Sequence, residues 1–363
     1  MLTAALALAG CATGGPAPAP DARPAAAGPV SYPADGPCPP LAERARLSMP
    51  AVATSASSSW MYVAQARGLF AACGLDVEIT QANTSAQTSA YLAGELPIAV
   101  VGGGTPGAIA ATGRPLAVLA VLGNAPVFSM LARTPVTSAA DVRGATIGVL
   151  SPVDGTNKVA HYYLGQQGVP AGEVTFAYLN TMPNVVAALE SGAVDLAVLS
   201  APSADIQEFR GMVRVADFHE APIDNPANAV IAEPTWLAEH PDVAANLLRA
   251  VLAGVYQVQA DPQAGSPVIA QALGIDPATP EGAAAMAGVQ RTVHFAYRPV
   301  RDILTVDAPT VELFRSTAPP EIADRLRERD MTELLPTPDV GAGLAADGFA
   351  AHLERLYGPL PAG

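Results

Sequence analysis

The sequence predicts an α/β protein of two lobes, each a mainly parallel sheet flanked by helices. Its length of 363 residues exceeds what one hydrophobic core usually supports, so two lobes or domains are expected. Half of the residues are apolar and 14% are charged, which predicts a large buried interior and excludes a disordered chain. Strand-like and helix-like segments alternate at short intervals in two sets, as in parallel sheets covered by helices.

The first set, residues 46–132, predicts strands joined by helices. Apolar residues at helical spacing between Trp60 and Ala66 lead into residues 67–70 (RGLF), and residues 74–79 (GLDVEI) then alternate as a strand does. The predicted strands are residues 47–53, 75–80, 98–101 and 116–122.

An apolar run at residues 115–132 is about as long as a membrane span, but Gly123, Asn124 and Pro126 interrupt it in the middle. We interpret the run as two buried strands joined near a hinge. Asn124 is accordingly one of the candidate ligand-binding residues.

The second set, residues 141–215, repeats the pattern of the first. Residues 187–199 (AALESGAVDLAVL) place a glycine after a helix and then a buried strand, as residues 93–99 (AGELPIA) do, and helix C-caps require such a glycine. The two lobes therefore look like analogous units. The predicted strands are residues 146–150, 174–178, 194–199 and 213–215.

Beyond residues 228–232 the sequence predicts mainly helices. A long amphipathic pattern runs from Val243 to Ala260, in which apolar residues share one face at spacings of three and four. These residues are Leu247, Leu248, Val251, Leu252 and Val255.

The first eleven residues predict a secretory leader. They are apolar, too short to span a bilayer, and end in Leu8-Ala9-Gly10-Cys11, which resembles a bacterial lipobox with Cys11 as the lipidated residue. The basic start of an ordinary leader is missing. The alternative is a buried free cysteine in an ordinary helix. Residues 12–45, rich in Pro and Ala, predict an extended tether.

Two further cysteines, Cys38 and Cys73, predict a disulfide. Outside the cytoplasm a remaining pair tends to be oxidised. Cys38 precedes the first predicted strand and Cys73 the second, and parallel strands begin at the same sheet edge. One buried and one exposed thiol is the alternative.

Residues 60–104 resemble the first lobe of bacterial extracytoplasmic solute-binding proteins that feed ABC importers, in the group handling sulfonates, nitrate and thiamine-precursor pyrimidines. Residues 141–149 (DVRGATIGV) resemble the entry into that family's second lobe. The resemblance covers roughly residues 46–275 and implies the type II periplasmic-binding-protein fold. In that fold the C-terminal helices return to lobe 1, so residues 46–132 and 225–363 form lobe 1 and residues 133–224 form lobe 2.

The resemblance implies reversible capture of a small molecule in a cleft between the lobes, without catalysis or a cofactor. The expected partners are an ABC permease and its ATPase, and the protein is expected to be a lipid-anchored, extracytoplasmic monomer. Hinge passages are expected at residues 132–136 and 221–228. A net charge of −14 disfavours nucleic acid as a partner.

A glycine triplet follows the strand at residues 98–101. Residues 102–107 match the G-x-G-x-x-G dinucleotide fingerprint, but the acidic residue that would hold a ribose is missing, since no Asp or Glu occurs between Glu95 and Asp141. We interpret the triplet as one lip of the cleft, with Gly103, Gly104 and Thr105 near the ligand. A plain tight connection is the alternative.

Hydroxyl residues 54–59 (TSASSS) follow the first predicted strand. One of them can cap the next helix, and the surplus predicts a ligand-binding loop that includes Ser57 and Ser58. Trp60 is either a stacking wall of the cleft or a core residue.

Residues 151–157 (SPVDGTN) occupy the matching place in the second lobe, where the resembled family often has a Gly/Ser-rich loop. If Asp154 faces the cleft, it favours a neutral or cationic solute; if it is the helix N-cap, it carries no such information. Five further cleft candidates lie at or after the ends of the predicted strands of the second lobe: Thr156, Asn157, Asn180, Thr181 and Ser200.

No catalytic or metal-binding motif is present. The five histidines have no metal spacing, and H-E-x-x-H, G-x-S-x-G and P-loop patterns are missing. The alternatives to a receptor are an enzyme on the same scaffold, similar to thiamine-pyrimidine synthases, and a sensor lipoprotein without a transporter. Loops with few cations suggest a neutral polar or aromatic solute, although helix N-termini can hold a carboxylate or sulfonate. The sole lysine, Lys158, is attributed to genomic composition bias.

Overall fold

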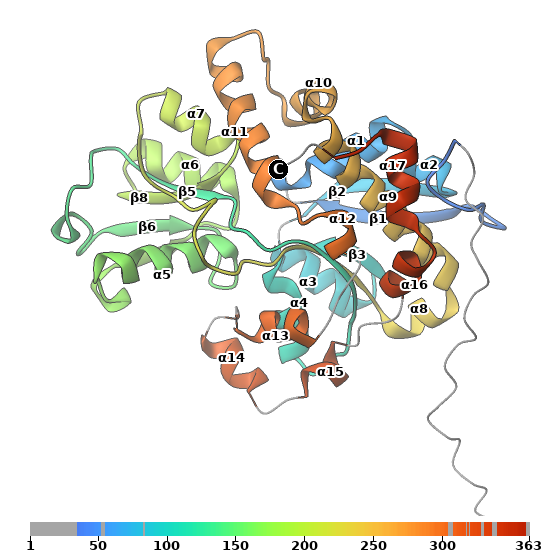
Figure 1. Cartoon of the computed structure of the whole chain (residues 1–363). Helices are drawn as coiled ribbons and strands as arrows, with labels where there is room; N and C mark the ends of the chain where they lie inside the picture. The colour runs from blue at the N-terminus through green and yellow to red at the C-terminus, as the bar shows by residue number, and fades with distance from the viewer. Residues whose placement is uncertain are drawn as a thin grey trace, which may run out of the picture. The chain divides into compact units, whose positions relative to one another are not determined.

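The computed structural model describes residues 35–51, 55–82, 84–303, 308–316, 318, 320–327, 330–335 and 340–360 (Figure 1). All of them belong to one compact unit, residues 31–363. The predicted leader, Cys11 and most of the tether lie outside the described residues. Among the described helices, none is long and apolar enough to cross a membrane.

The first lobe contains two sheets. Strands β1 (Ala45–Ala51) and β2 (Leu75–Gln81) pair in parallel, with Leu47 opposite Val77. Strands β3 (Ile98–Val101) and β4 (Ala117–Gly123) both pair antiparallel with β10 (Ala227–Ala232), which lies between them. The sequence analysis predicted the first four strands to within two residues at each end but did not predict β10, which returns from the second lobe.

The second lobe is one five-stranded sheet in the order β7-β6-β8-β5-β9. Strand β6 is parallel to β7 and β8, whereas β5 is antiparallel to β8 and β9. The strands are β5 Phe128–Ala132, β6 Thr146–Val149, β7 Thr175–Tyr178, β8 Leu196–Ser200 and β9 Val213–Asp217.

The position of β5 moves the lobe boundary. The sequence analysis placed residues up to 132 in the first lobe, but β5 pairs with the second lobe's sheet. The chain therefore passes between the sheets at residues 124–127 and again at residues 218–226, between β9 and β10. A local apolar pattern identifies a buried strand but contains no information about which sheet it joins.

Alternating side chains build a separate core on each face of the second-lobe sheet. Leu196 and Val198 pack in the core beneath α5 (Gly155–Gln167), and Ala197 and Leu199 pack in the core beneath α6 (Met182–Ser191). Figure 1 shows α5 on one face and α6 with α7 (Ser203–Phe209) on the other.

The long helix α9 (Pro241–Ala260) packs in the first-lobe core. Its amphipathic pattern predicted one buried face, but every residue from Asn246 to Val258 is buried. Pro241 begins it, and Gly254 lets it approach α1 closely, because a Cβ there would lie 2.8 Å from the carbonyl oxygen of Trp60. The other helices are α1 Ser59–Ala66, α2 Leu69–Ala72, α3 Thr84–Ala93, α4 Gly104–Ala111, α8 Pro234–Glu239, α10 Pro262–Leu273, α11 Pro280–Ala296, α12 Val300–Ile303, α13 Ala308–Ser316, α14 Pro320–Leu326, α15 Met331–Leu334, α16 Val340–Ala346 and α17 Phe349–Tyr357.

Short 3-10 helices occur at Ala56–Ser58 (η1), Ala139–Asp141 (η2) and Ala171–Glu173 (η3).

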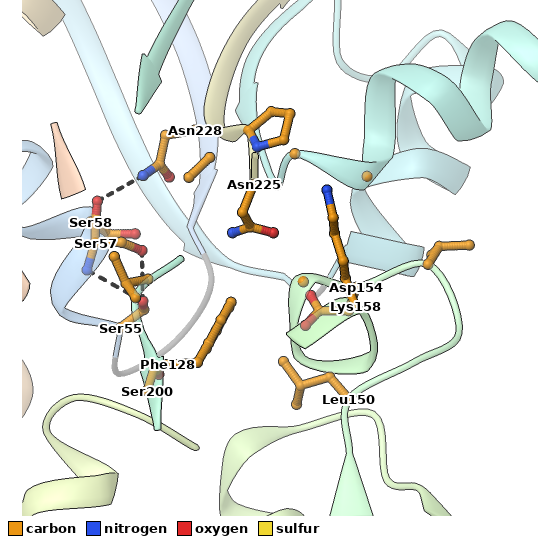
Figure 2. A pocket seen from close by; sticks show the side chains of 18 of the residues that line it. Ser55, Ser57, Ser58, Phe128, Leu150, Asp154, Lys158, Ser200, Asn225 and Asn228 are labelled. Atoms are coloured by element: carbon orange, nitrogen blue, oxygen red, sulfur yellow. Dashed lines mark hydrogen bonds between the residues drawn. The ribbon is translucent and has the colours of Figure 1, made fainter. Parts of the chain in front are cut away.

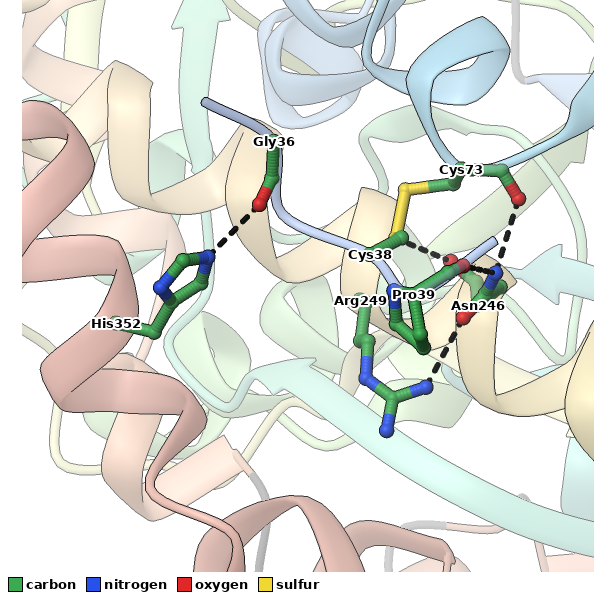
Figure 3. The surroundings of a disulfide bond; sticks show 7 residues. All are labelled: Gly36, Cys38, Pro39, Cys73, Asn246, Arg249 and His352. Carbon is green, nitrogen blue, oxygen red and sulfur yellow. Dashed lines mark hydrogen bonds between the residues drawn. A yellow bond between two sulfur atoms is a disulfide. The ribbon is translucent and has the colours of Figure 1, made fainter. Parts of the chain in front are cut away.

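The segment that precedes β1 is held to the first lobe by a disulfide between Cys38 and Cys73 (Figure 3). Both cysteines are buried, so the alternative of one exposed thiol does not describe this structure. The Asn246 side chain donates to the carbonyl oxygens of Pro39 and Cys73 at 2.9 and 3.0 Å, and a His352 ring nitrogen lies 2.8 Å from the Gly36 carbonyl oxygen.

Candidate functional site

A pocket of about 100 Å³ is lined by strand-end loops of both lobes and by the passages between them (Figure 2). The first lobe contributes the serine loop, residues 55–58, and glycines 102–104. The second lobe contributes Phe128, Leu150, Val153, Asp154, Gly155, Lys158, Met182 and Ser200. The passages contribute Val127, Asn225 and Pro226, and the start of β10 contributes Ala227 and Asn228. This is the arrangement in which α/β proteins bind ligands, at the ends of strands where loops converge.

Hydrogen bonds from neighbouring residues hold the backbone of the serine loop in place. The Ser57 carbonyl oxygen accepts hydrogen bonds from the Asn228 side chain and the Tyr297 hydroxyl, both at 2.9 Å. The hydroxyls of Ser55 and Ser57 lie 2.8 Å apart, and Ser59 donates to the Ala56 carbonyl at 2.6 Å. The loop therefore presents its hydroxyls to the pocket from a fixed backbone.

One backbone hydrogen bond joins this loop directly to the second lobe. The N–H of Ala56 donates to the carbonyl oxygen of Ala201, which follows β8, at 3.1 Å. The two lobes are thus in contact at the rim of the pocket.

The glycine triplet packs closely against the second passage and the second lobe. A Cβ at Gly103 would lie 1.5 Å from the Pro226 carbonyl oxygen, and one at Gly104 would lie 2.1 Å from the Val153 carbonyl oxygen. No other residue type fits at these two positions in this arrangement, because real Cβ atoms do not approach so closely. The glycines are required for close approach of backbones, whatever the ligand.

Asp154 has both of the roles that the sequence left open. It is the N-cap of α5, where its Oδ1 accepts from the backbone N–H and the hydroxyl of Thr156, both at 2.8 Å, and it also lines the pocket. Burial raises the pKa of Asp154, although the two hydrogen bonds from Thr156 act to lower it.

Lys158, one turn further along α5, also lines the pocket, and the sequence analysis did not predict this. Its ammonium donates to the carbonyl oxygen of Asp224 in the passage between β9 and β10. Burial lowers its pKa to about 8, against the opposing effect of Asp224. The sequence contains one indication of this role, since its single lysine lies near the start of a helix that follows a predicted strand.

Phe128 of β5, Asn225 of the second passage and Asn228 of β10 also line the pocket and were not among the predicted binding residues. Asn228 has a left-handed backbone (φ 54°), which asparagine tolerates better than most residues. The N–H of Asn225 donates to the Asn124 carbonyl at 2.8 Å. Figure 2 shows the Asn225 side chain in the middle of the lining residues. The sequence shows neither a positive φ nor the points at which the chain passes from one sheet to the other.

Of the predicted ligand-binding residues, the structure brings six together around the pocket. They are Ser57, Ser58, Gly103, Gly104, Asp154 and Ser200.

The other predicted residues lie elsewhere. Trp60 and Thr105 are fully buried. Thr156 donates to Asp154, and the Asn157 side chain donates to the Pro152 carbonyl, so both shape the loop without lining the pocket. Asn124 donates to the Asp224 carboxylate at 2.7 Å within the passages. Asn180, which has φ 65°, and Thr181, the N-cap of α6, precede the lining residue Met182.

The family described as NMT1/THI5-like matches residues 55–265. The chain belongs to this family. No curated protein matches the sequence. The region that the family matches, residues 55–265, contains both passages and every described lining residue of the pocket.

Solved structures establish the fold as that of the periplasmic binding proteins. The alkanesulfonate-binding protein SsuA of Xanthomonas axonopodis, bound to MOPS, is 16% identical over 81% of this chain and 98% of its own, with a TM-score of 0.65. The aliphatic sulphonate binding protein SsuA of Escherichia coli is 16% identical over 81% and 99%, with a TM-score of 0.62. The desulfurization enzyme DszB is 14% identical over 84% and 99%, with a TM-score of 0.60.

Proposed function

We propose that this NMT1/THI5-like family member is the solute-binding component of an ABC importer, which captures a small molecule in the pocket between its lobes. The observation that supports this most is the origin of the lining, since one pocket takes residues from the strand-end loops of both lobes and from both passages. A ligand held there contacts both lobes at once, so binding and closure are coupled. The SsuA structures, which share the fold, are named as sulfonate-binding proteins.

The hinge in this proposal is the pair of passages at residues 124–127 and 218–226, with residues 45–123 and 227–360 in one lobe and residues 128–217 in the other. The two passages are hydrogen-bonded to each other, through Asn225 N–H to the Asn124 carbonyl and Asn124 to the Asp224 carboxylate. A hinge made of two linked segments permits rotation of one lobe with little unpacking of either core.

The test is ligand-dependent closure of the purified protein. We expect at least one solute from a broad panel to raise the thermal midpoint, and the same solute to decrease the radius of gyration measured by small-angle X-ray scattering. A panel without any stabilising solute would contradict a binding function.

An enzyme on the same scaffold is the alternative, because DszB shares the fold. Among the described residues that line this pocket there is no histidine or cysteine to act as a base or nucleophile. Mass spectrometry of a bound solute after prolonged incubation distinguishes the two functions: a receptor returns it unchanged, and an enzyme converts it.

The remaining parts of the proposal concern location and partners. We propose a lipid anchor at Cys11, a position on the outer side of the cell membrane, a monomeric receptor, and a permease with its ATPase as the recipients of the solute. Replacing Cys11 with serine should release the protein from the membrane fraction. Co-purification with a permease in the presence of solute tests delivery.

A further inference from the structure

The pocket also has a charge preference, and this inference rests on the function proposed above. We propose that the ligand carries a basic nitrogen, an amine or amidine in its protonated form, which donates to the free oxygen of Asp154.

The hydrogen bonds of Asp154 leave one of its oxygens available. Oδ1 accepts both bonds from Thr156, at 2.8 Å each. Within the described part of the chain, Oδ2 has no partner. Figure 2 shows this carboxylate turned toward the space around which the lining side chains are arranged. A capped carboxylate whose second oxygen faces a pocket is a fixed acceptor.

No positive charge of the protein neutralises this carboxylate. Among the described residues, Asp154 forms no ion pair within 4.0 Å, and the nearest cation along α5, Lys158, donates instead to the Asp224 carbonyl. The N-terminus of α5 stabilises the negative charge in part. Burial raises the pKa of the carboxyl, because the two hydrogen bonds from Thr156 offset its desolvation only in part. A ligand cation supplies the missing charge.

The surroundings of Asp154 suit a nitrogen cation. Phe128 lies against the first residue of α5, because its Cε2 is 2.8 Å from where a Cβ of Gly155 would be. An aromatic ring beside a carboxylate is a favourable environment for an organic cation. The other open groups are neutral: the hydroxyls of Ser58 and Ser200 and the Asn225 amide.

The Asp154 carboxylate would repel an anionic ligand. The ligand's charge would lie beside the Asp154 carboxylate, and Lys158 is the only cationic side chain among the described residues that line the pocket. Like charges at short range in a partly buried site repel, because the protein screens them less than bulk water does.

The experiment uses matched solutes and matched variants. Small scaffolds are each tested as the amine, the alcohol and the sulfonate, by thermal shift and then by calorimetry. We expect amines to bind at least tenfold more tightly than their alcohols, with sulfonates weakest. Asp154→Asn retains the Oδ1 acceptor for Thr156 and should remove the preference for amines. Lys158→Met removes a like charge and should raise amine affinity.

Asp141→Asn is the control. It removes the same unit of charge at the end of η2, where Asp141 accepts from the backbone N–H of Ser138 and does not line the pocket, and it should leave the preference unchanged. Amine binding that Asp154→Asn does not weaken, or sulfonates that bind as tightly as the matched amines, would overturn the inference and leave the receptor function intact. The absence of any binding solute would overturn both.

Discussion

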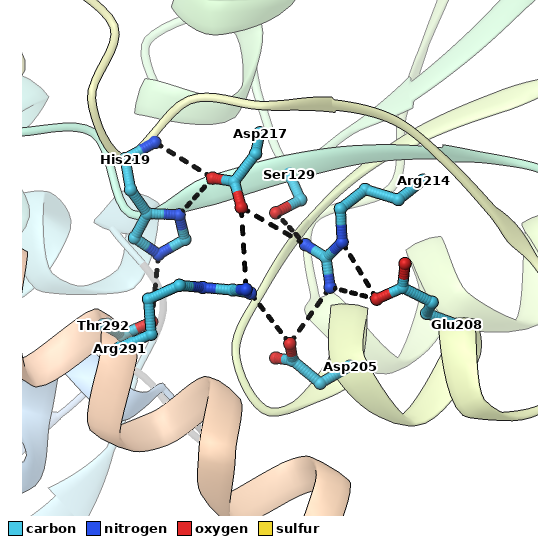
Figure 4. Close-up of polar contacts among 8 residues, drawn as sticks. All are labelled: Ser129, Asp205, Glu208, Arg214, Asp217, His219, Arg291 and Thr292. Carbon is cyan, nitrogen blue, oxygen red and sulfur yellow. Dashed lines mark hydrogen bonds and ion pairs between the residues drawn. The ribbon is translucent and has the colours of Figure 1, made fainter.

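Two regions of this protein contain carboxylates, cations and hydroxyls close together: the pocket at the start of α5, and a polar cluster between the second lobe and α11 (Figure 4). The polar cluster consists of Ser129, Asp205, Glu208, Arg214, Asp217, His219, Arg291 and Thr292.

The charges of the polar cluster neutralise one another. Arg214 pairs with Asp205 at 3.0 Å and with Glu208 at 2.7 Å, and Arg291 of α11 pairs with Asp205 at 2.9 Å. The His219 ring bridges from Asp217 to Thr292 of α11. Every charged residue of the cluster has an ion pair, so the cluster fixes α11 against α7 and β9.

The pocket differs in leaving its polar groups open. Among the described residues, Oδ2 of Asp154, the hydroxyls of Ser58 and Ser200 and the side-chain amide of Asn225 have no hydrogen-bond partner. The pocket and the polar cluster contain the same types of residue, so residue type alone does not identify a binding site. The pocket groups are open to a ligand, which can supply their missing partners, whereas the unpartnered atoms of the polar cluster, Asp205 Oδ2 and Arg291 Nε, are buried within the chain.

The largest expected effect comes from breaking the polar cluster. Arg214 and Asp205 have side chains that are 13% and 9% exposed, so Arg214→Met would leave Asp205 partly uncompensated in a buried site. We expect the free energy of unfolding to fall by about 3 kcal/mol. Chemical denaturation measures this. Arg46→Met is the control, since the exposed pair of Arg46 and Asp76 should contribute less than about 1 kcal/mol. Equal effects of the two variants would contradict our account of the cluster.

The contact between the lobes at Gly104 should govern affinity rather than stability. A methyl group there would clash with the Val153 carbonyl, so Gly104→Ala should disfavour the arrangement seen here by about 1–3 kcal/mol. Ligand affinity should fall roughly 10- to 100-fold, measured by calorimetry.

Gly165→Ala is the matched control for Gly104→Ala. Gly165 lies within α5 with open space around its Cα, so alanine there should leave affinity unchanged and stabilise the helix by up to about 1 kcal/mol. Unchanged affinity in Gly104→Ala would show that binding does not require this contact.

Acid should weaken the polar cluster over a defined range of pH. Burial alone would raise the pKa of Asp217, but hydrogen bonds from the ring and backbone of His219, with the charge of Arg291, lower it to about 2 from its ordinary value of 3.8. Stability from this carboxylate is therefore complete above pH 4 and is lost as the pH falls toward 2. Since Asp217 is partly exposed, the loss should be about 1 kcal/mol. Asp217→Asn should be less sensitive than the wild type to this fall in pH, and equal sensitivity would contradict the assignment.

The smallest effect is spectroscopic and concerns the pocket. Because Lys158 is the only lysine, reductive ¹³C-methylation labels one side chain besides the chain's α-amine. Its NMR resonance should titrate with a pKa of about 8, since burial lowers the value from 10.5. Titration near 10.5 would show that Lys158 is solvated and not held toward the Asp224 carbonyl.

Much of the fold could be predicted from local patterns. Residues 98–101 were predicted as a strand with both ends correct, and residues 75–80 with one residue missing. Burial of alternating or continuous apolar residues is a local property, so it is visible in sequence. Strand β10 and the sheet that β5 joins were not predicted, because pairing connects segments that are distant in the chain.

The sequence by itself determined that loops with hydroxyls, glycines and one acid follow the strands, because strand ends and helix caps require those residues in a local order. Only the tertiary structure decided which of them share a pocket. Lys158, Asn225 and Phe128 reach it because two chain passages bring strand ends of different lobes together. Whether Oδ2 of Asp154 has a hydrogen-bond partner was also decided by the tertiary structure, because it depends on which groups the folded chain places opposite that oxygen.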